Sequence, residues 1–167
     1  MGNIKTIDMD AAALRNVFIC QLSLLYAAKT HLTASLPALV EHAAFDTLKN
    51  ALTEDFDDSN KQMLSLQEIL DLLDEAPMTD NCLGMNAIIS EAYRNVLFLN
   101  GKNYESDMSI IFYMGVIEHL QLGAGRMLNL IAKNKHFKQY ALLVEQTLDM
   151  CVDNANLFHL IAEEYVN

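Results

Sequence analysis

Residues 18–36, FICQLSLLYAAKTHLTASL, decide the fold of this chain. Apolar side chains recur in this stretch at alternating spacings of four and three residues, the pattern of a helix that packs inside a bundle. Lys29 occupies one position of that apolar seam, between Leu25 and Leu32. A lysine in such a place must extend its charge to solvent, pair with a buried acid or remain unfavourably desolvated. The stretch therefore predicts a core helix that is interrupted by one charge.

Three further amphipathic segments complete a bundle. We expect long helices over residues 10–42, 46–75, 106–133 and 137–165, and a shorter one over residues 82–99. Two of the connections are short, which makes the helices that they join antiparallel neighbours. Two helical hairpins joined by one long crossover are the topology of ferritin-like proteins. We therefore predict an all-α, ferritin-like antiparallel four-helix bundle, with an extra short helix in the crossover between the second and third long helices.

The composition limits the classes of function. The chain has 167 residues, so we expect a single domain over residues 1–167 with a substantial core. Its formal net charge of −11 argues against a nucleic-acid partner, because phosphates would be repelled. No uninterrupted apolar run reaches the length of a membrane span and no secretion leader is recognisable, so we expect no membrane partner. The three cysteines are far apart, which favours reduced thiols and a cytoplasmic location.

Each long helix has a polar interruption near its middle. Extending the apolar seams identifies these positions as Lys29 in the first helix, Asp57, Asp58, Ser59 and Gln62 in the second, Glu118 and Gln121 in the third, and Cys151 and Asn154 in the fourth. Antiparallel packing brings the middles of the four helices to a similar depth. We therefore predict one polar layer inside the bundle.

Two interpretations of this layer remain open from the residues alone. Polar residues in a bundle core can fix the register and pairing of the helices without any chemistry. Alternatively, such a layer binds two metal ions through a Glu from each of two helices and a Glu-x-x-His from each of the other two. The chain contains no Glu-x-x-His. His119 directly follows Glu118, so their side chains diverge by about 100° around the helix.

Four segments, in order along the chain, carry a resemblance to a known family. They are residues 21–32 (QLSLLYAAKTHL), 56–62 (FDDSNKQ), 81–85 (NCLGM) and 118–121 (EHLQ). They resemble, respectively, the first helix, the second helix, the start of the crossover helix and the Glu-His-x-Glu motif of the bacterial YciE/YciF-type ferritin-like family. The resemblance extends from about Leu14 to Asn167. It implies a ferritin-like fold, a metal site in the polar layer and a link to stress responses.

The resemblance also shows where this chain departs from the family. Family members carry Glu where this chain has Lys29, and the second Glu of the third helix is here Gln121. Asp57 and Asp58 are shortened forms of the paired acids of the second helix, so that only Glu118 persists unchanged. We hypothesise that the Lys29 ammonium replaces the metal charge, bonded to Glu118 and to Asp57 or Asp58, and that no cofactor binds. In the alternative, Asp57, Asp58 and Glu118 retain one hard cation, iron or manganese.

These expectations describe a non-catalytic protein with a structural or interaction role in a stress response. Cys151 and His119 could be imagined as a nucleophile and its base, but a cysteine among apolar bundle residues is usually a small hydrophobe, so we expect no enzyme. The first helix and the crossover carry apolar residues outside the seams, including Val17, Ile89 and Tyr93. Such a surplus predicts a homodimer, unless the crossover packs across the bundle and is buried there.

Overall fold

The computed structural model describes residues 10–77, 82–98 and 102–167. Its elements are α1 (Ala11–His42), α2 (Asp46–Leu72), α3 (Leu83–Phe98), α4 (Tyr104–Ala132), the short 3-10 helix η2 (Lys138–Tyr140) and α5 (Ala141–Val166). The described ranges contain helices and no strand, as the sequence predicted. Asn81, the first residue of the crossover motif, lies outside the described residues.

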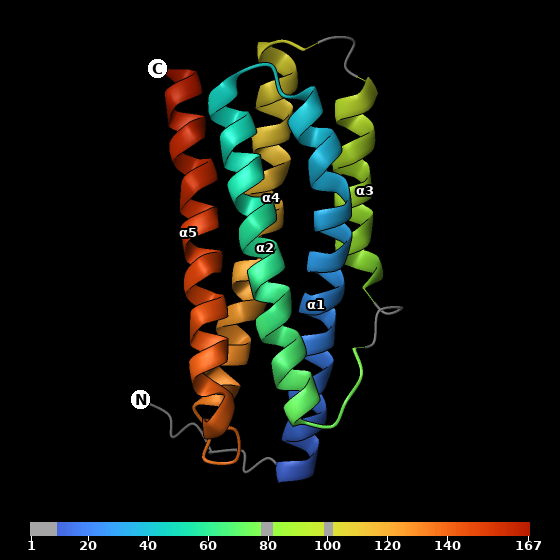
Figure 1. Cartoon of the computed structure of the whole chain (residues 1–167), viewed down its shortest axis with the longest axis vertical. Helices are drawn as coiled ribbons and strands as arrows, with labels where there is room; N and C mark the ends of the chain where they lie inside the picture. The colour runs from blue at the N-terminus through green and yellow to red at the C-terminus, as the bar shows by residue number, and fades with distance from the viewer. Residues whose placement is uncertain (1–9, 78–81, 99–101) are drawn as a thin grey trace, which may run out of the picture.

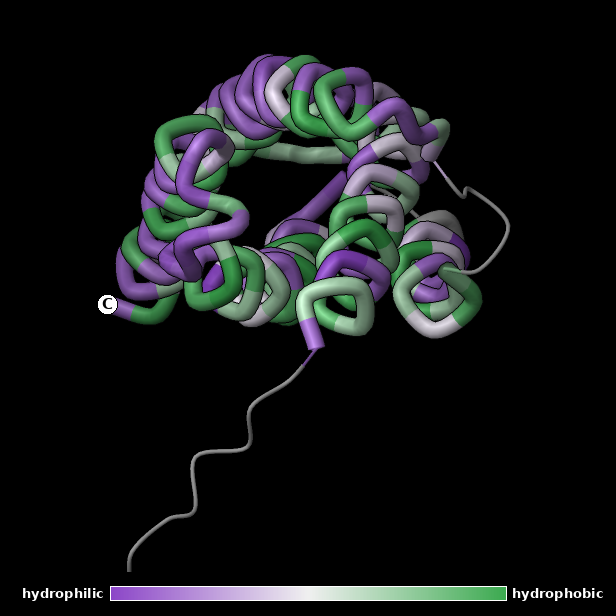
Figure 2. Tube along the Cα trace, turned by 90° about the horizontal axis from the view of Figure 1, so that it is seen from below, coloured by the Kyte–Doolittle hydropathy of each residue, from purple (hydrophilic) through white to green (hydrophobic). Residues whose placement is uncertain are grey.

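The four long helices form a ring, and every pair of neighbours in it is antiparallel (Figure 1). Helix α1 packs on α2 and α4, and α5 packs on α2 and α4. Helix α3 contacts α1 and α4 from outside the ring, which the view along the bundle axis shows directly (Figure 2). The chain therefore makes two hairpins, α1–α2 and α4–α5, joined by a crossover that contains α3. The predicted all-α bundle and its crossover are confirmed.

The helices begin at polar caps, one of which comes from a distant part of the chain. The side chain of Asp10 accepts a hydrogen bond at the start of α1, and Asn103 forms a reciprocal capping box with Ser106 at the start of α4. At the start of α2, Phe45 has no capping side chain of its own. Instead, the Asp107 carboxylate of α4 accepts from the backbone N–H of Ala44 at 2.7 Å and of Phe45 at 3.1 Å. This contact fixes one end of the α1–α2 hairpin against α4.

Pro37 lies inside α1 and does not divide it. The helix continues through Pro37 to His42. A proline within a helix removes one backbone donor and crowds the preceding turn. Here Leu36 and Leu39, on either side of Pro37, are buried at 0% and 4% exposure. Their packing holds the last turns of α1 in the bundle.

The apolar core is split into two clusters along the bundle axis. One cluster contains Leu32 and Leu36 of α1 together with Leu48 and Leu52 of α2. The other contains residues from the opposite ends of the same helices, such as Leu25 of α1 and residues 66–73 of α2. In every long helix the segment between the two clusters carries buried polar side chains. The polar layer thus lies where the sequence placed it.

The crossover helix is covered by the bundle rather than left free for a partner. Ile89, Ala92 and Val96 of α3 are at most 2% exposed, and Tyr93 packs at the edge of the same cluster. The alternative given for this segment therefore holds, and the apolar surplus of the crossover does not indicate a dimer surface. On the first helix, Val17 is 42% exposed.

Helix α1 is the one described helix long and apolar enough to cross a membrane by length and composition. Its 32 residues include polar ones such as Gln21 and Lys29, so it is not an uninterrupted apolar run. A helix at the core of a bundle has the same length and composition, and the seam of α1 from Phe18 to Leu36 lies inside the ring. The length and composition of α1 therefore give no argument for a membrane protein.

Candidate functional site: a buried polar layer

Nine polar or sulfur-bearing side chains lie at one level of the bundle, each at most 2% exposed. They are Lys29 of α1, Asp55, Ser59 and Gln62 of α2, Glu118 and Gln121 of α4, and Thr147, Cys151 and Asn154 of α5. Seven of them were singled out from the sequence. Asp55 and Thr147 were not among the predicted site residues, whereas the predicted Asp57 and Asp58 do not belong to the layer.

Lys29 is the buried cation at the centre of this layer. Its Nζ donates a hydrogen bond to Ser59 Oγ at 3.2 Å and lies 3.7 Å from Glu118 Oε2. The side chains of Lys29 and Glu118 are both fully buried. At 3.7 Å the contact with Glu118 is an ion pair rather than a direct hydrogen bond. The lysine therefore does not extend to solvent but pairs with an acid across the bundle.

Asp55 is the second buried acid, and it is bonded through its neighbours rather than to Lys29. Its Oδ1 accepts from Ser59 Oγ at 3.3 Å and from Asn154 Nδ2 at 2.8 Å. A chain of contacts thus runs from Glu118 through Lys29, Ser59 and Asp55 to Asn154, joining all four long helices. The sequence contained a signal for Asp55: spacings of three and four residues run from Leu52 through Asp55, Ser59 and Gln62 to Leu66.

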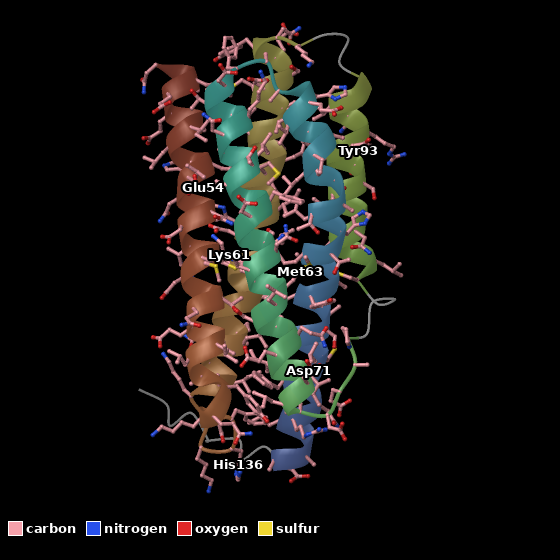
Figure 3. All side chains as sticks on the ribbon, in the orientation of Figure 1. Glu54, Lys61, Met63, Asp71, Tyr93 and His136 are labelled. Atoms are coloured by element: carbon pink, nitrogen blue, oxygen red, sulfur yellow. The ribbon has the colours of Figure 1, made fainter. Side chains whose placement is uncertain are left out.

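Asp57 and Asp58 are surface residues, which corrects the predicted partners of Lys29. Asp57 is exposed, and Asp58 pairs with Lys61 at 2.7 Å on the outside of α2. Figure 3 labels Glu54, Lys61 and Asp71 along this outward face. The sequence reading followed a ladder through Phe56, one position away from the true seam. One residue turns a helix by about 100°. A ladder through Phe56 therefore turns Asp55 away from the core and brings Asp57 and Asp58 nearer to the expected seam. The alternative cation site at Asp57, Asp58 and Glu118 is excluded by the same placement.

The layer contains two acids and one base within the described residues. Burial raises the pKa of Glu118, and the nearby Lys29 ammonium opposes this rise. Burial and the neighbouring Glu118 together raise the pKa of Asp55 well above its ordinary value, against a smaller opposing effect of Lys29. One ammonium neutralises one carboxylate, so the remaining acid is favoured in its protonated form. We assign the ion pair to Lys29 and Glu118, and the proton to Asp55.

Several buried polar atoms of the layer have no hydrogen-bond partner. They are Asp55 Oδ2, Gln62 Oε1, both carboxylate oxygens of Glu118, and both amide atoms of Gln121. Gln62 Nε2 makes only long contacts, to Thr147 O at 3.5 Å and to Cys151 Sγ at 3.6 Å. Buried polar atoms without a partner are costly, so these atoms lower the stability that the layer contributes.

The donor set does not fit a divalent metal ion. Within the described residues no group of three or more His, Cys, Asp or Glu side chains is placed to hold a metal. The ammonium of Lys29 stands beside Glu118, where it repels any cation. Burial raises the pKa of Cys151 to about 11, so this thiol stays protonated and is neither a ready ligand nor a nucleophile. His119 lies on the exposed side of α4, bonded to Gly115 O.

Replacing Asp55 with asparagine is expected to raise the free energy of unfolding at neutral pH. Asparagine has the shape of the protonated acid, and its oxygen can accept from Ser59 and Asn154 as Asp55 Oδ1 does. A folded-state pKa raised above the unfolded value destabilises the fold at high pH, and this cost fades as the pH falls below the unfolded pKa. Each pKa unit corresponds to about 1.4 kcal/mol.

Urea unfolding of both proteins at about pH 7 and about pH 4 measures this difference. The advantage of Asp55→Asn should be largest at the higher pH and should shrink on acidification. Asp71→Asn, on the exposed end of α2, serves as the matched control and should change little. A variant less stable than wild type at pH 7 would show that Asp55 is ionised in the fold.

Comparison with known proteins gives the chain a family. The family described as "Domain of unknown function (DUF892)" matches residues 13–167. The chain belongs to this family. Protein YciF of Escherichia coli (strain K12) is 24% identical over 148 residues, which cover 88% of this chain and 84% of that protein.

Two solved structures of this kind confirm the fold. The crystal structure of the E. coli stress protein YciF matches with a TM-score of 0.84 at 22% identity, over 92% of this chain and 97% of that one. YcfI of Rhodopseudomonas palustris, described as a proposed structural protein, matches with a TM-score of 0.81 at 20% identity, over 92% and 97% of the two chains. At these sequence identities, the structural likeness shows the all-α bundle fold alone.

Proposed function

We propose that this protein is a non-catalytic, ferritin-like bundle in which Lys29 takes the place of metal charge, and that it serves a structural or interaction role in a stress response. The observation that carries the proposal is the position of Lys29 Nζ, fully buried between Ser59 on α2 and Glu118 on α4. The relatives support the role, because one is described as a stress protein and another as a proposed structural protein.

We infer that the layer corresponds to a di-metal site that has lost its ligands. A ferritin-like centre uses one Glu from each of two helices and a Glu-x-x-His pair from each of the other two. In this chain the pairs at that spacing are Ser59 with Gln62 on α2, Glu118 with Gln121 on α4 and Cys151 with Asn154 on α5, and none of them is a Glu with a His. Lys29 and Glu118 face each other across the bundle. The acids of the layer are Glu118 and Asp55, and no histidine belongs to it.

The burial of the layer also supports a non-catalytic role. Cys151 is fully buried and its pKa is raised by burial, so it supplies no thiolate. Glu118 is paired with Lys29 inside the bundle and reaches no solvent-exposed substrate. Cys82 and Cys151 are free buried thiols and Cys20 is a free exposed one, which supports the proposed cytoplasmic location.

Wild-type protein purified without chelator is expected to contain far less than one equivalent of iron or manganese. Elemental analysis, followed by titration of the purified protein with Fe²⁺ and Mn²⁺ in an anaerobic calorimeter, provides the measurement. The reason is electrostatic, because the ammonium occupies the space in which a cation would meet Glu118. Near-stoichiometric metal in the wild-type protein would disprove the proposal.

Lys29→Glu supplies the positive counterpart of this experiment. It places three carboxylates, those of residues 29, 55 and 118, at one level with no cation to neutralise them. We expect this variant to be unstable alone and to gain thermal stability on addition of Mn²⁺, whereas wild type shows no such gain. Lys61→Glu, which alters the charge of an exposed residue on α2, is the control and should not respond to Mn²⁺.

A further inference from the structure

We propose that a pocket between α1 and α3 binds a small phosphate monoester. The pocket has a volume of about 370 Å³, and its lining comes from both helices: His31, Ala34 and Ser35 of α1, and Ser90, Tyr93 and Arg94 of α3. Pockets that bind small molecules have volumes of roughly 300–1,000 Å³. The pocket lies at the junction where α3 covers α1 from outside the ring of long helices (Figure 2).

This pocket is separate from the polar layer inside the bundle. Lys29 and His31 are two residues apart on α1, so their side chains point about 200° apart around the helix. Lys29 is fully buried inside the ring, whereas His31 lines the pocket on the side of α3. The inference therefore does not depend on the role proposed for Lys29.

The polar lining of the pocket consists of hydrogen-bond donors. Among the described residues, the five polar side chains that line it are a histidine, two serines, a tyrosine and an arginine, and none of them is an acid. The guanidinium of Arg94 alone carries five N–H donors, and it can bind a phosphate group through two parallel hydrogen bonds. Hydroxyl groups and a histidine ring add further donors. Such a lining fits an oxyanion and offers nothing that holds a cation.

The surroundings of the pocket are short of acids on a chain that is rich in them. The chain has 22 Asp and Glu residues, yet residues 11–40, which make up nearly all of α1, contain none. Glu41, the first acid of α1, lies about two turns past the pocket. The one acid of α3, Glu91, accepts a hydrogen bond from the Tyr113 hydroxyl of α4 at 3.4 Å. A ligand anion in the pocket thus avoids most of the negative charge of the molecule.

The positive charge of Arg94 is available to a ligand. Arg94 is exposed and makes no ion pair within the part of the chain that the structure describes. Four other basic residues do pair with acids: Arg15, Lys29, Lys49 and Lys61. Because Arg94 contributes no such contact to the fold, its guanidinium can turn to an anion without breaking one.

A contact between the two helices holds two of the donors side by side. His31 Nε2 lies 3.2 Å from Ser90 Oγ, and the Ser35 hydroxyl donates to the His31 carbonyl oxygen at 3.1 Å. When the His31 ring is cationic, Nε2–H donates to Ser90 Oγ, which leaves the Ser90 hydroxyl proton for a ligand oxygen. The Nδ1–H of the same ring remains a further donor. An anion in the pocket and the imidazolium therefore stabilise each other.

The remaining lining indicates that the phosphate carries an organic group. A phosphate group by itself occupies only part of the pocket volume. Tyr93 of α3, labelled in Figure 3, is half-buried and packs against the apolar cluster of the bundle, so its ring is held in place. Aromatic rings pair favourably with one another. Tyr93 and the neighbouring Ala34 thus form the wall for the organic part of the ligand, and an aromatic ester fits this wall best.

Calorimetric titration of the full-length protein with phenyl phosphate tests the proposal. Wild type should bind one equivalent, and Arg94→Gln should lower the affinity about tenfold or more, because charge-assisted hydrogen bonds are lost. Arg126→Gln removes the same charge from an exposed position of α4 and should stay within about twofold of wild type. Wild type that shows no saturable binding at millimolar ligand would overturn the inference, as would equal losses in the two variants.

Two further titrations identify the source of the phosphate. Inorganic phosphate should bind more weakly than phenyl phosphate, because it leaves the wall at Tyr93 uncovered. Equal affinities would overturn the assignment to an ester. Wild type should not sediment with vesicles that contain phosphatidic acid, because an anionic surface repels a chain with a net charge of −11. Sedimentation with these vesicles would overturn the assignment to a soluble ester.

Nuclear magnetic resonance of the histidine rings tests the location. The chain has five histidines, and the His31→Gln variant identifies the ring signals of His31. Phenyl phosphate should shift these signals in the wild type and leave those of His136 unchanged. His136 lines a different pocket, together with Arg15, at the end of the bundle where α1 begins. Shifts of the His136 signals in place of those of His31 would overturn the proposed site.

Discussion

Replacing Lys29 with methionine is expected to lower the free energy of unfolding by about 3–5 kcal/mol at neutral pH. The substitution keeps an unbranched side chain of similar reach in the layer and removes only the charge. Glu118 is fully buried beside Lys29, and neither of its oxygens has a hydrogen bond. Without the ammonium, its carboxylate is an uncompensated charge in the core, which is the costly way to break a buried ion pair.

A double-variant cycle in urea identifies the cause of this loss. Glu118→Gln combined with Lys29→Met removes both charges and should recover much of the stability that Lys29→Met loses. The single variant should also gain stability on acidification, because loss of the cation raises the pKa of Glu118 further and the protonated acid needs no partner. Lys61→Met, at an exposed pair, should have little effect. A double variant as unstable as Lys29→Met would contradict the ion pair.

Replacing Asp107 with alanine is expected to lower the free energy of unfolding by about 3–5 kcal/mol. The carboxylate of Asp107 is fully buried and accepts three hydrogen bonds, from the backbone N–H groups of Ala44 and Phe45 and from the hydroxyl of Tyr165 at 2.7 Å. It joins the α1–α2 connection, α4 and the end of α5. Its removal leaves buried donors unpaired at the start of α2.

Hydrogen exchange distinguishes loss of this contact from a general loss of stability. In Asp107→Ala, the amide protons of Ala44 and Phe45 should exchange faster relative to those in the middle of α2. Tyr165→Phe removes one of the three bonds and should cost about 1–2 kcal/mol, with the protection of both amides retained. Burial and the Asp107 carboxylate raise the pKa of Tyr165, so its hydroxyl remains a donor at neutral pH. Unchanged exchange at Ala44 and Phe45 in the alanine variant would refute the capping role.

The fold was predictable because its signals are local and repeated. The seam from Phe18 to Leu36 repeats for five turns, and its hydrophobic period specifies a core helix whatever its partners are. The long segment between the second and third long helices indicated a crossover, and α3 occupies it. The expected helix over residues 10–42 includes Pro37, and α1 continues through it because the packing of neighbouring helices outweighs the local preference of proline.

The sequence predicted the level of the candidate site along the bundle axis, but not all of the residues that form it. Interrupted seams placed Lys29, Glu118 and Gln121 in one layer, as the structure does. The second helix offered two ladders one residue apart, through Asp55 or through Phe56, and both are partly apolar. Only the contacts of that helix with the others show that Asp55 faces inward. The periodicity of one helix therefore does not determine which residue of another helix pairs with its buried charge.

The sequence by itself determined that this protein is an all-α bundle with a lysine in its core, because hydrophobic period and connection length are local properties of the chain. The tertiary structure decided which acid meets that lysine, since Asp55, Asp57 and Asp58 differ only in the rotation of α2. It also decided which apolar residues remain exposed. The surplus on α3 is buried against α1 and α4, whereas Phe112 and Leu130 of α4 remain exposed in the described structure. Neither outcome follows from composition, because burial depends on which helix faces are brought together.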